Sequence, residues 1–245
     1  MSGHCIFCGT TTGPFTTREH ILPESLGGGD WAILAPGLYC DGCQNHFGST
    51  IEQQALADYP FSFFRVFLGI PTKKGKPPWT PTWEGTIRAS LRPGTIGYDP
   101  SPPFQSVMES GTKTQLRLLA EPVRPEMICR TLLKIGLEVV ANNNPEDAYH
   151  ERYDAARAFA RYGRKDGAWW YLHHEDPDGA NHYITRGVTS QEWTQNVQLA
   201  TVEIGDGAEV LHLKLLYLDL FVPLEQRIQP PKENLPAPEF RLFLV

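Results

Sequence analysis

Hydrophobic and polar positions near the start of the chain predict one well-defined helix. The pattern begins at Asp41, which can cap a helix, and continues with apolar side chains at Phe47 and Ile51. Pro60 ends it. The next run, residues 61–69, is strongly apolar, so we expect it to pack the first part of the chain against the rest.

Two short strands are predicted before this helix. One ends near residues 20–22, and the other covers residues 37–40 and leads into the helix. The glycine-rich stretch 27–30 between them is predicted to be a flexible connection.

A longer amphipathic pattern predicts a second helix over residues 127–141. Its apolar side chains recur at helical spacing, and we expect the opposite side, with Arg130, Lys134 and Glu138, to face water. Another helix is predicted to start at residues 144–147, where an Asn cap precedes Pro and early acids, and to end at Gly163.

The remaining pattern in the second half is typical of strands. Strand-like runs cover residues 115–119, 168–174, 197–204, 209–222 and 240–245. Within the run 209–222, residues 211–222 are apolar on both faces and predict one central strand, and Gly205-Asp-Gly207 before the run predicts a hairpin. We therefore expect a mainly antiparallel sheet packed by two helices.

A proline-rich stretch divides the chain into two parts. We predict a first domain over residues 1–70, an ordered proline-rich connection over 71–104, and a second domain over 105–245. The predicted fold class is α+β. The second domain matches no domain that we can name, and substrate selection, sensing and assembly are its candidate roles.

Composition and charge narrow the class of protein. Hydrophobic residues make up 41% of the 245 residues, which is enough for a substantial core. The net charge of −6 argues against coating nucleic acid by charge alone, although an active site needs only local basic groups. No apolar run of about 18 residues and no secretory leader occurs, so no membrane contact is expected.

Two C-x-x-C pairs, Cys5/Cys8 and Cys40/Cys43, have the spacing of a tetrahedral zinc site. Four thiolates leave no open position, so the predicted zinc is structural. The fifth cysteine, Cys129, lies on the apolar side of a helical pattern, and an odd thiol beside such a tetrad is typical of a reducing cytoplasm. Disulfides between the two pairs are the alternative.

Three motifs, in order, carry a resemblance to a known family. The first C-x-x-C pair is followed by Arg18-Glu-His-Ile-Leu-Pro-Glu-Ser-Leu-Gly-Gly-Gly29, and the second pair by Gln44-Asn-His-Phe-Gly48. Over about residues 4–52 this order resembles the HNH endonucleases. The resemblance implies a zinc-braced ββα-metal unit and metal-dependent cleavage of phosphodiester bonds, with DNA favoured over RNA as substrate.

Elementary chemistry agrees with the roles that the resemblance implies. His20 is expected to deprotonate water, because an imidazole titrates near neutral pH. Glu19 offers a carboxylate to a catalytic Mg²⁺ or Mn²⁺, which would neutralise the phosphate. By itself the Glu-His dipeptide would be a surface pair, but its place between the two cysteine pairs favours catalysis.

The family pattern puts a second ligand of the catalytic cation just after the last cysteine. This sequence has Gln44, Asn45 and His46 there, and we expect Asn45 first, His46 second and Gln44 third. Successive helical residues are about 100° apart, so only one or two of them can face the ion. The middle Asn of the family name has no match in residues 30–39, so another side chain or a backbone carbonyl is expected to take its orienting role.

Candidate nucleic-acid contacts are Arg18 and the lysines Lys73, Lys74 and Lys76. A solvated surface is the alternative for each of them. His173, His174 and His182 lie near acidic residues, but their spacing fits no metal template, so we expect a solvated loop there. The stretch 169–171 is predicted to be a core strand rather than a base-stacking surface.

Two further functions stay open at this stage. A non-enzymatic, zinc-braced nucleic-acid-binding module with a lapsed site is favoured by Gln44, the missing middle Asn and the acidic charge balance. A protein-interaction scaffold is the third hypothesis. The family resemblance also suggests restriction or phage defence as a setting, and a homo-oligomer is possible.

Overall fold

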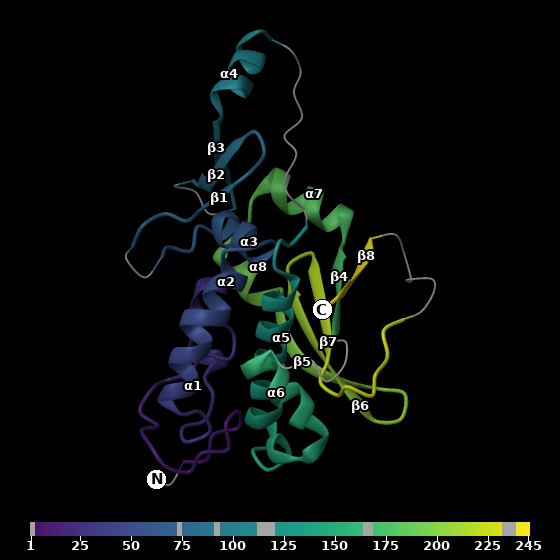
Figure 1. Ribbon diagram of the computed structural model, residues 1–245. Helices are drawn as coiled ribbons and strands as arrows, with labels where there is room; N and C mark the ends of the chain where they lie inside the picture. The colour runs from purple at the N-terminus through teal and green to yellow at the C-terminus, as the bar shows by residue number, and fades with distance from the viewer. Residues whose placement is uncertain (1–2, 73–74, 91–93, 112–120, 164–168, 232–238) are drawn as a thin grey trace.

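The computed structural model describes residues 3–72, 75–90, 94–111, 121–163, 169–231 and 239–245. Helices and antiparallel sheets share these residues, which confirms the predicted α+β class. Figure 1 shows the helices of the N-terminal unit (residues 3–70) on one side of helix α5, and the larger sheet on its other side.

The predicted helix of the N-terminal unit is confirmed and begins at Asp41. It is one continuous helical run with a π-helical middle, because Phe47–Glu52 widens between two α-helical stretches. After the turn at Pro60 comes α3, which ends at Gly69 in a left-handed conformation with φ 68°. The helical segments are η1 Glu24–Leu26, η2 Asp30–Ala32, α1 Asp41–His46, η3 Phe47–Glu52, α2 Gln53–Leu56 and α3 Phe61–Leu68.

The two predicted short strands are reduced to a single β-bridge between His20 and Ile33. Two further backbone bonds extend it, from Ile21 N to Ala32 O at 2.7 Å and from Leu34 N to Glu19 O at 3.0 Å. The partner of the His20 segment is therefore residues 32–34, and the strand predicted at 37–40 is wrong. That stretch is a turn and bend instead.

The proline-rich region forms an arm that projects from the body (Figure 1). A three-stranded antiparallel sheet, β1 Trp79–Pro81, β2 Gly85–Ala89 and β3 Ile96–Pro100, is followed by α4 Pro102–Glu109. The strand character predicted in this region is present in β2, and its role as a connection between two domains stays a prediction. None of the residues of α4 is buried.

The C-terminal unit (residues 121–245) surrounds α5 with helices and a five-stranded sheet. The sheet has the order β5-β6-β7-β4-β8, and every neighbouring pair is antiparallel. Its elements are α5 Pro125–Asn143, η4 Asp147–Tyr149, η5 Glu151–Tyr153, α6 Asp154–Tyr162, β4 Trp170–Glu175, α7 Pro177–Arg186, α8 Ser190–Gln195, β5 Val197–Ile204, β6 Ala208–Leu215, β7 Leu218–Pro223 and β8 Phe240–Leu244.

Sequence patterns located most of these strands but missed one turn. The hairpin at Gly205-Asp-Gly207 is confirmed, since β5 and β6 pair up to Ile204 and Ala208. The single strand predicted over 209–222 is two strands, joined at Leu216 and Tyr217. Both turn residues are buried, so the turn carries no polar signal, although Leu216 adopts φ 56°. The strand predicted at 115–119 lies outside the described residues.

Helix α5 lies at the centre of the molecule, and its predicted wet face is wrong. Arg130 is only 7% exposed, and Lys134 and Glu138 are 0% exposed. One side of α5 packs on strands β5, β6 and β7, while another contacts η3 and α2 of the N-terminal unit. The side that a two-layer arrangement would leave in water is therefore covered by the N-terminal unit.

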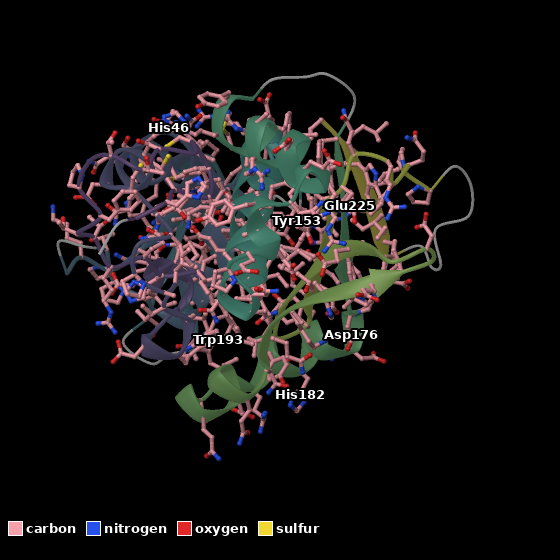
Figure 2. The ribbon with its side chains drawn as sticks, turned by 90° about the horizontal axis from the view of Figure 1, so that it is seen from below. His46, Tyr153, Asp176, His182, Trp193 and Glu225 are labelled. Atoms are coloured by element: carbon pink, nitrogen blue, oxygen red, sulfur yellow. The ribbon has the colours of Figure 1, made fainter. Side chains whose placement is uncertain are left out.

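Buried hydrophobic side chains form one cluster that runs through both units. Trp193 of α8, labelled in Figure 2, reaches across to Gly27, where an added Cβ would lie 2.2 Å from its Nε1. The predicted division into domains at 70 and 105 stays a prediction. Among the described helices, none combines the length and hydropathy needed to cross a bilayer.

Candidate metal centre and adjoining cleft

The four predicted zinc ligands come together at the base of the N-terminal unit. The Sγ atoms of Cys5, Cys8, Cys40 and Cys43 all lie within 4.8 Å of one another. A tetrahedron with zinc–sulfur bonds of about 2.3 Å has sulfur–sulfur edges of about 3.8 Å. The Cys8–Cys40 separation of 3.7 Å matches this edge, and all five cysteines are free thiols, so the donor set fits a structural zinc.

Local structure holds the cysteines in place. Gly9, at φ 69°, closes the first turn with a bond from its N to Cys5 O at 2.9 Å. Cys40 Sγ accepts from the backbone N–H of Cys43 at 3.4 Å and caps α1. A hydrogen bond with Cys43, opposed by burial, lowers the pKa of Cys5 to about 4, and the same hydrogen bond raises the pKa of Cys43.

The start of α1 also anchors the segment that carries Glu19 and His20. The Asp41 carboxylate accepts from the backbone N–H of Thr16 at 2.8 Å and from its hydroxyl at 2.7 Å. It also accepts from the N–H and hydroxyl of Thr17. The chain is therefore held at Asp41 just before Glu19 and at the β-bridge just after it.

A cleft of about 710 Å³ opens next to the metal centre. Glu19 and His20 both line it, and their catalytic roles stay predictions. Gln44, Glu52 and Arg65 line it as well, from α1, η3 and α3. Carboxylate, imidazole and guanidinium groups thus face the same space.

His20 is held at the edge of this cleft with its side chain 17% exposed. Its Nδ1 lies 3.7 Å from Oε1 of Glu24, which is four residues further along the chain. This distance is too long for a direct hydrogen bond but short enough for an ionic contact. Glu24 is therefore a candidate for orienting His20, the role that the family resemblance assigns to the middle Asn.

Glu19 does not stand free in the cleft. Its Oε1 accepts a hydrogen bond from Nζ of Lys134 at 2.6 Å, and its side chain is only 9% exposed. Burial raises the pKa of Glu19 above its usual value, while the Lys134 ammonium opposes the rise. Sequence reasoning missed this contact because Lys134 was assigned to a solvated helix face.

Lys134 forms ion pairs with three carboxylates. Its Nζ lies 2.6 Å from Glu19, 2.9 Å from Oε1 of Glu52 and 3.0 Å from Oε2 of Glu138. Burial would lower the pKa of Lys134, but the three carboxylates outweigh it and raise this pKa well above its usual value. Burial raises the pKa of Glu138 well above its usual value. We call these four residues the Lys134 cluster.

The structure separates the three residues that follow Cys43. Gln44 lines the cleft, whereas Asn45 is exposed and lies outside the lining. Nε2 of His46 lies 2.7 Å from the backbone oxygen of Arg161, and its ring therefore turns toward α6. The assignments of Asn45 and His46 as ligands stay predictions, and the geometry favours Gln44, our third choice.

The predicted basic contacts have different positions. Arg18 lines the cleft, but its guanidinium pairs with Asp30 at 2.7 Å, and both side chains are largely exposed. Lys76 is exposed and outside the cleft lining, and Lys73 and Lys74 lie outside the described residues.

Arg65 was missed by sequence reasoning. It is half-buried in the cleft wall, and its Nε has no hydrogen-bond partner among the described residues. The available signal was a lone arginine inside the strongly apolar run 61–69. A charged side chain in such a run needs a reason, and a position facing the cleft supplies one.

A second polar cluster joins the N-terminal unit to the sheet. Glu175 Oε1 lies 2.8 Å from Nε2 of His173 and 3.1 Å from Arg241, and it accepts from the Tyr59 hydroxyl. Burial opposes ionisation of Glu175, but the bonds from His173 and Tyr59 outweigh it and lower its pKa. The solvated loop predicted for His173 and His174 is wrong, because both lie in β4.

The core strand predicted over residues 169–171 is confirmed in its burial. Trp169, Trp170 and Tyr171 are all buried, and the last two belong to β4. Trp169 donates from Nε1 to Pro223 O at 3.1 Å, which satisfies its polar atom inside the core.

The comparisons with known proteins agree with this site. Residues 5–60 match the family model described as HNH endonuclease. No curated protein and no solved structure matches the chain. The match confirms the resemblance found over about residues 4–52, and residues 5–60 form an HNH-type nuclease unit at the level of the family. The matched segment extends beyond Cys43 and includes Glu52.

Proposed function

We propose that this protein is a metal-dependent endonuclease that hydrolyses phosphodiester bonds in nucleic acid, with DNA preferred over RNA. The observation that supports it most strongly is the shared cleft, in which Glu19 and His20 face the same space beside the cysteine centre. A surface Glu-His pair would not line a cleft together with Glu52 and Arg65.

His20 is the base in the proposed reaction. Its Nδ1 faces Glu24, which leaves Nε2 to take a proton from water. The resulting hydroxide attacks phosphorus, the bond from phosphorus to the 3′ oxygen breaks, and the departing oxygen takes a proton from solvent water. The products carry a 5′-phosphate and a 3′-hydroxyl.

Glu19, Glu52 and Gln44 would hold the catalytic Mg²⁺ or Mn²⁺. Two carboxylates and an amide are the oxygen ligands that these ions prefer, and all three side chains line the cleft. When bound, the ion supplies neutralisation of the phosphoryl oxygens and stabilisation of the departing oxygen. The carboxylates already surround a positive charge, that of Lys134.

Arg65 and Arg18 are the proposed phosphate contacts. A guanidinium can bind two phosphate oxygens at once. Arg65 is the stronger candidate, because no carboxylate forms an ion pair with it among the described residues, whereas Arg18 is shared with Asp30.

A nicking assay on supercoiled plasmid tests the function. We expect nicking with Mg²⁺ or Mn²⁺, none with EDTA, and a loss of about 10²-fold or more for His20→Ala. The matched control is His182→Ala, because His182 is exposed on α7 (Figure 2) and does not line the cleft. Intact plasmid with every metal, or equal nicking by His20→Ala, would overturn the proposal.

One observation favours the second candidate, a nucleic-acid-binding module with a lapsed site. Glu19 is already neutralised by Lys134 at 2.6 Å. For that module we expect plasmid binding in a filter assay without cutting under any metal. A cytoplasmic location, a role in restriction or phage defence, and a homo-oligomer stay predictions.

A further inference from the structure

Lys134 belongs to the C-terminal unit, but its ammonium group lies among carboxylates of the N-terminal unit. It is 115 positions from Glu19 in the sequence and donates to it at 2.6 Å. Helix α5 carries it there by packing on η3, whose last residue is Glu52. The contact therefore connects the candidate cation ligands to the second half of the chain.

The surroundings of Nζ resemble those of a bound cation. Three carboxylate oxygens, from Glu19, Glu52 and Glu138, lie within 3.0 Å of it, and the Lys134 side chain is 0% exposed. The ring of Tyr39 is 5.7 Å from Nζ on another side. No solvent reaches the ammonium, so all of its charge is balanced by protein groups.

The groups near Nζ also include buried oxygen atoms that Lys134 does not satisfy. The second oxygen of Glu138, Oε1, and the Tyr39 hydroxyl are buried without a hydrogen-bond partner among the described residues. Oε1 of Glu52 lies 2.9 Å from Nζ but lacks the geometry of a hydrogen bond. A single ammonium has only three N–H donors, whereas an ion of higher charge could engage more of these oxygens.

We propose that the Lys134 ammonium is the resident cation of the Glu19–Glu52 pair, and that a divalent cation binds these carboxylates only in competition with it. Two cations that share these oxygens repel each other strongly in a buried site. This inference rests on the proposed function for the use of the divalent ion, but it concerns binding and is tested by binding.

The competition makes metal affinity depend on α5. The segment just before α5 is attached to the N-terminal unit, because Asp58 accepts from the backbone N–H of Val123 at 3.0 Å and of Arg124, the N-cap residue, at 2.6 Å. A shift of α5 away from η3 would withdraw Lys134 and open the carboxylates to a divalent ion. The C-terminal unit thereby controls the site without contacting substrate.

The decisive variant is K134Q/E138Q. It removes the ammonium and its helical neighbour together, so the formal net charge is unchanged and no unpaired charge is left on α5. We expect the Kd for Mn²⁺, measured by electron paramagnetic resonance, to fall at least tenfold. The matched control is K214Q/D219N, which removes both charges of a different lysine–carboxylate pair. Lys214 and Asp219 lie 3.3 Å apart on the sheet, and this variant should bind Mn²⁺ as the wild type does.

An unchanged or weaker Mn²⁺ affinity in K134Q/E138Q, with a native circular dichroism spectrum, would overturn the inference. K134R keeps the charge and is expected to keep the wild-type affinity. If K134Q/E138Q does not fold, the NMR signals of the Lys134 ammonium and the Glu19 carboxyl are followed in wild type during Mg²⁺ addition. If the Glu19 signal shifts while the Lys134 signal stays unchanged, the inference is wrong. If both signals change together, or if neither changes, the result supports it.

The Mn²⁺-binding measurement and the nicking assay test the role of Lys134 and the nuclease function independently. Tighter Mn²⁺ binding by K134Q/E138Q without plasmid nicking by any variant would keep Lys134 as the resident cation and remove the nuclease. Nicking by the wild type, with equal Mn²⁺ affinity in wild type and K134Q/E138Q, would keep the nuclease and remove the role of Lys134.

Discussion

The cysteine cluster and the Lys134 cluster contact one helical run at different places and stabilise it in different ways. Cys43 stands in the first turn of α1, and all four cysteines come from the first 43 residues. Glu52 ends η3, and its positive partner comes from α5. The cysteine cluster offers four thiols to an external ion, whereas the carboxylates of the Lys134 cluster are paired with a side chain from the second half of the molecule.

The two clusters differ in what each needs in order to stabilise the N-terminal unit. A structural zinc contributes an apparent binding free energy of about 10–16 kcal/mol in small peptides. A buried ion pair contributes little net stability, but loss of one partner costs about 3–5 kcal/mol. The cysteine end therefore depends on metal supply, and the cleft end depends on the position of α5.

Removal of the zinc is expected to have the largest effect. Cys43→Ala or a strong chelator should unfold the N-terminal unit, because a core this small depends on the metal. The loss of ellipticity and of bound zinc measures it. Cys129→Ala is the matched control, since Cys129 is equally buried but outside the cluster; similar unfolding in both variants would contradict a structural zinc.

Loss of the Lys134 charge alone is expected to rank second. Lys134→Met leaves three carboxylates without their cation, so the free energy of unfolding in urea should fall by about 3–5 kcal/mol. Lys214→Met, which breaks a pair with a side chain 30% exposed, should cost about 1 kcal/mol or less. Equal losses in the two variants would show that the Lys134 cluster is no more than a surface contact.

Glu175 supplies a smaller and pH-dependent contribution. Because its pKa is lowered in the folded state, it stabilises the fold above its usual value of 4.5, and this contribution is lost as pH falls through the folded pKa. Glu175→Gln should cost about 1–3 kcal/mol at pH 7, with the difference from wild type narrowing below pH 4.5. Urea titrations at pH 7 and 4 check it, and a difference that grows in acid would refute it.

Two glycines give the smallest effects, with opposite signs expected. At Gly48 of η3 an added Cβ meets nothing within 4 Å, so Gly48→Ala should stabilise by up to about 1 kcal/mol. At Gly136 of α5 the Cβ would lie 2.5 Å from Cδ2 of Leu224 and 3.2 Å from Cβ of Leu211. Gly136→Ala should therefore gain nothing or lose about 1 kcal/mol, and thermal melts of both variants measure the contrast.

Features that depend on local spacing were predicted from the sequence. The two C-x-x-C pairs place their thiols together because each turn is short, and the structure brings the pairs within zinc reach. The helix start at Asp41 and the strand Val197–Ile204 follow from caps and from side-chain alternation. The neighbouring Glu19 and His20 share a cleft.

Features that depend on how one helix or strand is rotated relative to its neighbour could not be predicted. Which of Gln44, Asn45 and His46 faces the cleft depends on how α1 is rotated against the His20 segment, and no local pattern records that angle. Arg65 faces the cleft only because α3 folds back beside η1.

By itself the sequence determined the zinc ligands, the Glu-His pair and the main elements, because neighbouring residues and regular periods carry that information. Only the tertiary structure decided the environment of Glu19. The alternation on α5 distinguishes apolar from polar positions, but water and a second protein layer both satisfy polar side chains. Inside the molecule, Lys134 donates hydrogen bonds to Glu138 on the same helix and to Glu19. Glu19 lies 115 positions away in the sequence, so a local pattern does not record this contact.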